Sequence, residues 1–522
     1  MHVGMFEFSI NLMRNGIMSN ELNKSQTPET QASTDSSKTV VDEFESKQLL
    51  DEPARRMFFK RVALGGGGAL MAGAGTYGLG MNSLQGSPSD DYPLIDEKIF
   101  KPKDQRDTVL NFVSSKALNE KHPERNVQYN QLQHKEFNWQ NGIRDMYSKP
   151  WDNSKPGYTQ LDRALQKAGW EPLVVAGSRT SANLQPNTPL HAWDQSDVEK
   201  EQYKFESEKQ ASDAIKSAAR VFGVVKCGIA KRDKRWDYDP LYDTDNEREL
   251  SWEKDFPFEP KTVIVMLASM DFDCIATAPA WTADGTAADG YTQMSIKANQ
   301  MAKFLRGLGY QAVGAGNDLG SSVPYAIMAG LGEGGRNGAL LAPGVGPRVR
   351  IMKVYTDFEF VEYDRPHTWG MTDFCLSCGK CAEACPADAI PLPEDKNGGY
   401  GFEPSYEFSD EPGYTWNNHH GIKKFYSDAK KCYNFWVENG SACAACIASC
   451  TFNEPDFWHH WFIMAINPYM PKFLHTAMAE AHPAFGYGHT NDPKKVEKFW
   501  KTGEGMRVNP GMKNNIGTSN KS

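Results

Sequence analysis

The chain has 522 residues, of which 40% are hydrophobic, and it carries a formal net charge of -9 at pH 7. This length accommodates two to four domains, and this apolar content excludes a fully disordered chain. Because nucleic-acid binding requires a basic face, the acidic balance argues against DNA or RNA as a partner.

The first part of the chain has the layout of an export signal. Residues 1–50 are polar and show no lasting helical or strand period, so we expect them to be disordered. Arg55 and Arg56 follow, with an aromatic residue and a lysine close behind, and then a weakly apolar, glycine-rich run over residues 62–81. This order is typical of a twin-arginine signal, and the alternative is a chance arginine pair before a glycine linker.

Export by this route predicts where the protein works. The twin-arginine system moves folded proteins, so cofactors can be inserted before export. Apart from the signal, the chain has no run of about 18 apolar residues, which is the minimum for a spanning helix. We therefore expect a protein held peripherally on the outer face of the cytoplasmic membrane by a small hydrophobic anchor protein.

Two stretches that differ in composition and in secondary-structure pattern follow the signal. Residues 87–206 are loop-rich and aromatic, and we expect them to wrap around the rest of the protein. Over residues 207–365 helical and strand patterns alternate, which predicts an α/β core with a sheet covered by helices. The expected elements are helices at 211–222 and 293–309 and strands at 224–230, 261–270, 311–315 and 346–355.

A glycine loop follows the strand expected at 311–315. Residues 314–320 have the pattern G-x-G-x-x-x-G, which is one residue off the dinucleotide fingerprint, so we do not expect nucleotide binding. Glycines in such a loop instead let a flat or phosphorylated cofactor approach the backbone closely.

Eight of the ten cysteines lie between residues 375 and 450 in two runs. The first run is C-x2-C-x2-C-x3-C-P, the bacterial ferredoxin pattern for a [4Fe-4S] cluster. The second run departs from it: its gaps are ten, two and three residues, and Thr451 stands where the pattern has proline. In two-cluster ferredoxins the last cysteine of each run binds the other cluster. The predicted ligand sets are Cys375, Cys378, Cys381 and Cys450 for one cluster, and Cys385, Cys432, Cys443 and Cys446 for the other.

Zinc sites and disulfides are the alternatives for these cysteines. Zinc would favour units of four cysteines built from two C-x2-C pairs, and disulfides would favour unpatterned spacings, so iron–sulfur clusters fit better. The two remaining cysteines, Cys227 and Cys274, are expected to be buried thiols.

Several segments together resemble the respiratory reductive dehalogenases, in an order that covers essentially the whole chain. They are the arginine signal, a helix start at Asp289, Gly290 and Tyr291, the loop 314–322, the strand 346–355, the motif Thr372-Asp373-Phe374-Cys375, the paired cysteine runs, and the ending Phe485-Gly486-Tyr487-Gly488. The resemblance implies a nitroreductase-like corrinoid-binding core, of class α+β or α/β, and a bacterial two-[4Fe-4S] ferredoxin-like domain.

The resulting domain division has five parts. The expected segments are a disordered leader with its signal (1–86), the wrapping region (87–206), the corrinoid-binding core (207–365), the ferredoxin-like domain (366–456) and a C-terminal helical segment with a tail (457–522). The activity implied by the resemblance is replacement of the halogen of an organohalide, such as a chlorinated ethene or chloroaromatic, by hydrogen. This would be the terminal step of anaerobic organohalide respiration, with electrons passed from an upstream respiratory donor through the clusters.

The resemblance also assigns catalytic residues. The family's catalytic tyrosine falls on Tyr291, its supporting arginine on Arg350 and a pocket asparagine on Asn317. Reductive dehalogenation consumes two electrons and one proton, and a phenol can supply the proton because a neighbouring guanidinium favours the phenolate. Without the resemblance, Tyr291 would be interpreted as a core residue at a helix start and Arg350 as a salt-bridged strand residue.

Corrinoid binding has no independent motif in this sequence. Gly320, Ser321 and Ser322 lie in a segment that resembles a corrinoid-contacting loop of the family. The D-x-H-x-x-G cobalamin-ligand motif is absent, and the near match at His367 has one residue too many between its aspartate and histidine. We therefore expect His367 to be a linker residue, in line with the family's corrinoid, whose cobalt has no protein histidine ligand.

Two other functions stay open at this point. An epoxyqueuosine-reductase-like enzyme also combines a corrinoid with two clusters, but it should be cytoplasmic, and the arginine signal argues against that. A non-catalytic exported carrier of two [4Fe-4S] clusters would leave the α/β region 207–356 without a role.

Overall fold

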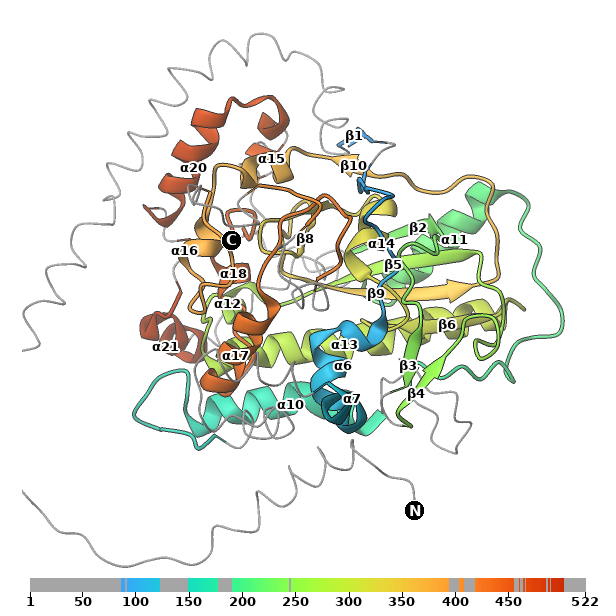
Figure 1. The fold of residues 1–522 in the computed structure, drawn as a ribbon, viewed down its shortest axis with the longest axis horizontal. Helices are drawn as coiled ribbons and strands as arrows, with labels where there is room; N and C mark the ends of the chain where they lie inside the picture. Colours follow the sequence, from blue (N-terminus) through green and yellow to red (C-terminus); the bar gives the residue numbers. More distant parts are fainter. Residues whose placement is uncertain are drawn as a thin grey trace, which may run out of the picture.

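The computed structural model describes residues 86–89, 92–122, 149–176, 190–243, 246–393, 403–407, 418–454, 460, 463–464, 466–484, 487–488 and 490–501. The leader, the arginine signal and part of the aromatic tract after residue 454 lie outside the described residues. At the centre of the fold is an antiparallel four-stranded sheet in the order β2-β5-β9-β6 (Figure 1). Its strands are β2 (Lys226–Lys231), β5 (Thr262–Ser269), β9 (Val349–Thr356) and β6 (Ala312–Ala315).

The four strands expected from the sequence are confirmed, with ends that shift by a few residues. The central strand β5 is a continuous apolar run because both of its faces are covered, as strands buried on two sides require. Side chains alternate along β9, so that Met352 and Val354 face one core and Val349 and Tyr355 face the other. The predicted mixed fold of helices and sheet is therefore confirmed.

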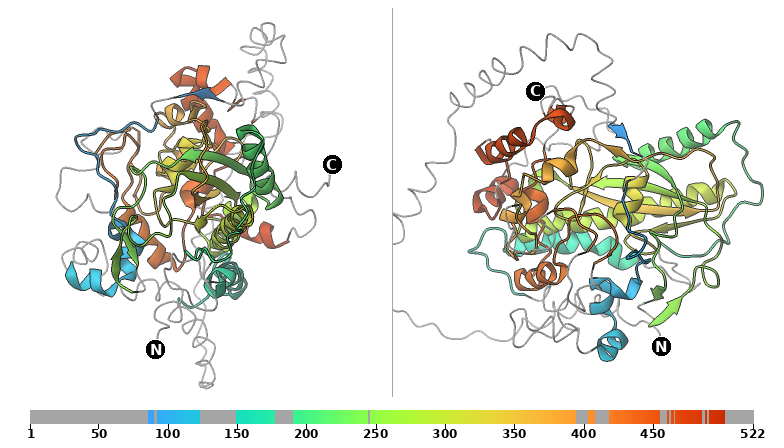
Figure 2. Two further views of the ribbon diagram at one scale, coloured as in Figure 1. Left: turned by 90° about the vertical axis from the view of Figure 1, so that its right-hand side faces the viewer. Right: turned by 45° about the horizontal axis from the view of Figure 1, so that its top comes forward.

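Helices cover both faces of the sheet (Figure 2). On one face α11 (Glu208–Val221) and α13 (Trp281–Gly307) pack over an aliphatic core. On the other, the short helix α14 (Ser322–Met328) packs over a core rich in tryptophan and tyrosine, including Trp236 and Trp252. Three of the buried tryptophans, Trp193, Trp236 and Trp252, thus belong to this second core.

The long helix α13 is paired with α10 (Gln160–Ala176) along most of its length. Glycines allow this close approach, since a Cβ at Gly169 would lie 2.6 Å from the carbonyl oxygen of Gly285. A Cβ at Gly285 would in turn lie 2.6 Å from Cγ of Leu165. The small residues that precede residue 291 therefore serve helix packing.

This packing corrects two expectations. The helix start expected at Asp289, Gly290 and Tyr291 is wrong, because α13 already begins at Trp281 and Tyr291 lies in its interior. The segment expected to be loop-rich also contains three α-helices within its described parts: α6 (Val109–Ser114), α7 (Lys116–Lys121) and α10. The 3-10 turn η2 (Gln105–Asp107) precedes α6.

Short two-stranded ladders connect the periphery to the core. β1 (Ser87–Pro88) pairs with β10 (His367–Thr368), so His367 lies in a linking strand. The other two ladders join β3 (Leu241–Asp243) to β4 (Arg248–Leu250) and β7 (Glu333–Gly334) to β8 (Leu340–Leu341).

The cysteine-bearing helices lie at the left of Figure 1, away from the sheet, and α13 runs from there toward the sheet. The helices at this end are α12 (Phe272–Ile275), α15 (Met371–Cys375), α16 (Lys380–Glu383), α17 (Ala429–Asn439), α18 (Ala445–Ala448), η3 (Asn467–Tyr469), α20 (Lys472–Ala484) and α21 (Pro493–Lys501). In the part of the chain that the structure describes, no helix combines the length and apolar character needed to cross a membrane.

Candidate functional site

Three side chains from distant segments meet at one place. Tyr291 comes from α13, Arg350 from β9 and Asn317 from the loop between β6 and α14. Asn317 Nδ2 donates a hydrogen bond to Tyr291 Oη at 3.4 Å, and the Arg350 guanidinium lies 4.4 Å from the centroid of the Tyr291 ring. The structure therefore brings together the three residues that the sequence singled out as catalytic.

The close approach of Arg350 depends on the glycine before Tyr291. A Cβ at Gly290 would lie 3.0 Å from Cγ of Arg350 and 3.2 Å from Cγ of Met270. Any larger residue would push against the stem of the arginine side chain. Gly290 therefore leaves room for Arg350 to reach the ring of the neighbouring tyrosine.

Trp170 is a fourth member of this group that sequence reasoning missed. Its ring stacks on Tyr291 with a centroid distance of 5.3 Å and an interplanar angle of 21°. Trp170 lies on α10, in the stretch expected to be loop-rich. No apolar helical period marks α10, because Leu161 is exposed and the buried side carries Asp162 and Gln166.

Hydrogen bonds from a lysine of the sheet hold the loop that carries Asn317 in place. The buried Lys353 on β9 donates hydrogen bonds to the carbonyl oxygen of Gly316 and, at 2.7 Å, to Ser322 Oγ. Asp318 Oδ1 accepts a hydrogen bond from the Gly316 backbone N–H at 2.6 Å. Burial lowers the pKa of Lys353 to about 8, while Asp318 and Asp237 act in the opposite direction.

The predicted cofactor-contacting residues lie where this loop meets a second layer of polar groups. The Ser321 backbone N–H donates to the carbonyl oxygen of Trp236 at 2.7 Å. A Cβ at Gly320 would lie 2.7 Å from Tyr355 Oη, so this glycine is required by the protein's own packing. Ser322 is held by Lys353.

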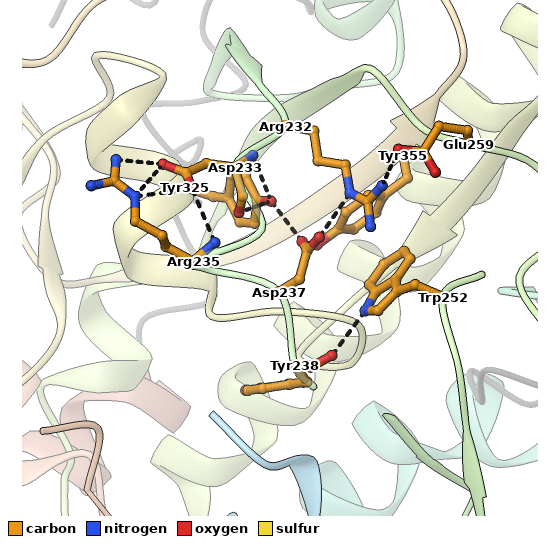
Figure 3. A network of polar contacts seen from close by, with 9 residues as sticks. All are labelled: Arg232, Asp233, Arg235, Asp237, Tyr238, Trp252, Glu259, Tyr325 and Tyr355. Carbon is orange, nitrogen blue, oxygen red and sulfur yellow. Dashed lines mark hydrogen bonds and ion pairs between the residues drawn. The ribbon is translucent and has the colours of Figure 1, made fainter. Parts of the chain in front are cut away.

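The layer behind the loop is a buried network centred on Asp237 (Figure 3). Its carboxylate pairs with Arg232 Nε at 2.8 Å and accepts hydrogen bonds from Tyr325 Oη at 2.6 Å and Tyr355 Oη at 3.2 Å. The Arg232 guanidinium also lies 4.4 Å from the ring of Trp252. Burial raises the pKa of Asp237, whereas Arg232 and Tyr325 lower it. These contacts give the loop a rigid support.

The eight clustered cysteines lie close together, and none of them forms a disulfide. Burial strongly raises the pKa of Cys381, and so do the charges of Cys375, Cys450 and Cys378. Burial likewise raises the pKa of Cys432, with further contributions from Cys446, Cys443 and Cys385. Such electrostatic effects require proximity, so the thiols lie close together, and the charge of Cys446 from the other predicted set also acts on Cys381. The division into two crossed ligand sets stays a prediction.

The surroundings of these thiols suit iron–sulfur clusters. Backbone N–H groups of Ala389 and Ala445 donate to the sulfur atoms of Cys385 and Cys443, at 3.3 and 3.4 Å. Thr451, which replaces the expected proline, has its hydroxyl 3.8 Å from Cys378 Sγ. No group of three or more side chains in the described residues could hold a single metal ion.

The second set of cysteines lies next to the tyrosine site. Burial raises the pKa of Cys446 to about 11, and the charge of Arg350 acts in the opposite direction. Cys443 packs in one apolar group with Met270 and with Ala283 and Ala287 of α13. Arg350 thus contacts the ring of Tyr291 and its charge also acts on Cys446. Of the two other cysteines, Cys274 is buried and Cys227 is half-buried.

Comparisons with known proteins agree with this arrangement. Residues 374–453 match the family model described as a 4Fe-4S dicluster domain. A tetrachloroethene reductive dehalogenase of Desulfitobacterium hafniense is 33% identical over 424 residues, covering 68% of this chain and 75% of that protein. A shorter match, to an epoxyqueuosine reductase of Cyclobacterium marinum, is 36% identical over 66 residues and covers 13% of this chain.

A solved reductive dehalogenase, described with a mechanism for B12-dependent dehalogenation, has a similar fold. The TM-score is 0.56 with 19% sequence identity, and the match covers 81% of this chain. The chain spans about half the length of that protein, since the match covers 51% of it. At this identity the likeness shows the fold alone.

Proposed function

The chain belongs to the reductive dehalogenases, oxidoreductases that act on carbon–halogen bonds, and we propose that Tyr291, Arg350 and Asn317 form the site where its organohalide substrate reacts. The observation that carries this proposal is the convergence of the three side chains from α13, β9 and the loop after β6. In the overall reaction the carbon–halogen bond breaks, halide leaves, and two electrons and one proton form the new carbon–hydrogen bond.

Tyr291 is the proton donor in this proposal. Because Asn317 Nδ2 donates to Tyr291 Oη, the phenolic hydrogen is left to point elsewhere, toward a bound substrate. Loss of that hydrogen leaves a phenolate whose charge spreads into the ring. The guanidinium of Arg350, 4.4 Å from the ring centroid, stabilises this charge, and the stacked Trp170 fixes the plane of the ring.

A corrinoid is the cofactor expected at this site. Two buried polar atoms around the Asn317 loop, Arg350 Nε and His191 Nε2, have no hydrogen-bond partner among the described residues, as expected for groups that face a ligand. His191 Cε1 lies 3.5 Å from where a Cβ of Gly316 would be. Ser321 and Ser322 border the same loop and would hold the corrinoid together with these groups. When bound, the corrinoid would supply a redox-active cobalt centre, with no protein histidine as its ligand.

Two [4Fe-4S] clusters would deliver the electrons. The set Cys385, Cys432, Cys443 and Cys446 would hold the cluster nearer the substrate, since Cys446 lies within electrostatic reach of Arg350. The set with Cys375 would hold the cluster that receives electrons from an upstream respiratory donor.

Reconstitution tests the function directly. The anaerobically purified chain would be loaded with iron, sulfide and a corrinoid, and halide release would be measured against a panel of haloalkenes and haloaromatics. Halide release that requires the corrinoid supports the proposal. Cluster loading without corrinoid uptake or halide release would instead support the non-catalytic electron carrier, and turnover of epoxyqueuosine would support that alternative.

The place of action is also part of the proposal. The Arg55–Arg56 motif supports export by the twin-arginine route, with the protein held on the outer face of the cytoplasmic membrane by a small hydrophobic partner. Export of a folded protein would allow its clusters and corrinoid to be inserted in the cytoplasm first.

A further inference from the structure

We propose that Arg336 raises the reduction potential of the cluster held by Cys375, Cys378, Cys381 and Cys450, and so sets how readily this cluster accepts electrons. The inference rests on the proposed clusters and concerns a residue outside both cysteine runs. Arg336 lies in the turn between β7 and β8.

The contacts of Arg336 lock its guanidinium against the ligand backbone. Nε and Nη2 both donate to the carbonyl oxygen of Cys375, at 3.0 and 2.9 Å, and Nη1 donates to the carbonyl oxygen of Pro391 at 2.9 Å. The guanidinium also lies 4.6 Å from the centre of the Phe425 ring. A planar fork with fixed donors on two carbonyls and an aromatic face has little freedom to move.

Burial makes the charge effective. Arg336 is 1% exposed, so water screens its charge poorly, and an arginine stays protonated at any ordinary pH. Reducing a cluster adds one negative charge to it. A fixed, buried cation beside the cluster stabilises the reduced form over the oxidised form, which raises the potential.

The neighbouring buried carboxylate, that of Glu333, caps the start of α15, the helix that ends at Cys375. Glu333 accepts hydrogen bonds from the backbone N–H groups of Trp369, Met371 and Thr372 at the start of α15. Glycine at the N-cap of α15 offers no side-chain oxygen, so Glu333 takes that role. Three donors share its negative charge, which opposes the charge of Arg336 at Cys375, while Arg336 itself donates to the Cys375 carbonyl oxygen.

The adjacent residue, Asn337, contacts the other cysteine set. Asn337 Nδ2 donates to the carbonyl oxygen of Cys446, a ligand of the other set, at 3.4 Å. The same turn therefore presents a cation to one cysteine set and a neutral amide to the other. Removing the charge of Arg336 should shift only one of the two cluster transitions.

The test is a redox titration of the holoprotein, followed by the electron paramagnetic resonance of the reduced clusters. In Arg336→Gln, which keeps amide donors but loses the charge, we expect the reduced-to-oxidised ratio of one cluster to fall about tenfold at fixed ambient potential, a shift of about 59 mV for one electron. Arg336→Lys keeps the charge and should stay near the wild type. Arg306→Gln, which removes a buried cation at the far end of α13, is the matched control and should move neither transition.

The outcomes separate this inference from the proposed function. A wild-type protein without cubane signals would refute the clusters themselves. With iron content intact, unchanged transitions in Arg336→Gln would overturn the role of Arg336. If Arg336→Gln fails to hold iron, the test falls to Arg336→Lys. A tenfold change in its reduced-to-oxidised ratio at fixed ambient potential would show that the geometry of the guanidinium, and not its charge, sets the potential.

Discussion

Replacing Tyr291 by phenylalanine isolates the proton-donating hydroxyl from everything else the residue does. The ring remains, and with it the stacking on Trp170 and the contact with Arg350. Among the described residues, the one hydrogen bond lost is that from Asn317 to Tyr291 Oη, which at 3.4 Å is long. Its loss should cost about 0.5–1.5 kcal/mol of stability, so the fold and the cofactor content should be nearly unchanged.

The effect on turnover should be far larger. A general acid contributes roughly 10²- to 10⁴-fold, which corresponds to ~2.7–5.4 kcal/mol of activation free energy. We therefore expect halide release by Tyr291→Phe to fall by that factor at normal iron and corrinoid content. Tyr310→Phe removes a hydroxyl that donates to the Tyr203 carbonyl oxygen away from the site, and it should keep full activity.

The same assay can refute the reasoning. A Tyr291→Phe enzyme with full cofactor content and undiminished halide release would show that the proton comes from water or from another residue. Arg350 provides a companion comparison: Arg350→Lys keeps a charge but loses the planar fork, and it should lose less activity than Arg350→Ala. Equal losses would argue against stabilisation of the phenolate by charge.

Three further outcomes are expected. The anaerobically purified protein should contain about eight irons, as two cubanes require, and about four irons would contradict the two sets. Cys381→Ser and Cys385→Ser should each disturb a different cluster. Replacing Arg55 and Arg56 by lysine should leave the protein in the cytoplasm on cell fractionation, and unchanged export would remove the signal assignment. Burial lowers the pKa of His419 to about 3 from the usual 6.5, so its contribution to stability is complete above pH 6.5 and is lost as the pH falls toward 3. Between these values this group should lower the free energy of unfolding by about 1.4 kcal/mol for each unit that the pH falls. Urea titrations at pH 7 and pH 5 measure this pH dependence, which should be weaker in His419→Gln. The same pH dependence in the wild type and the variant would contradict the burial argument.

The sequence alone predicted those features that depend on short-range spacing. The two cysteine runs predicted that the eight thiols come together, and their mutual charge effects confirm this proximity, while the assignment of each thiol to a cluster stays a prediction. The strands of the central sheet were found for a similar reason, since β5 is a nearly continuous apolar run and β9 is rich in β-branched and apolar residues. The family resemblance picked out Tyr291, Arg350 and Asn317 without showing how they contact one another.

Only the tertiary structure revealed α10 and the true start of α13. The buried side of α10 is polar, with Asp162, Arg163 and Gln166 in the interior, so no apolar period marks it. These groups are satisfied by distant partners: Asp162 by Thr282 at 2.6 Å, and Arg163 by the Gly440 carbonyl oxygen at 3.0 Å.

The position of Trp170 on the Tyr291 ring and the place of Arg336 against the Cys375 carbonyl have the same origin. Trp170 and Tyr291 are more than a hundred positions apart in the sequence, and Arg336 and Cys375 are some tens of positions apart. Both contacts depend on how helices and turns pack. Local spacing determines which residues can share a cluster or a strand. Which side chain lies over a particular ring or carbonyl is decided only by long-range packing. Individual contacts of this kind produce no periodic pattern in the sequence.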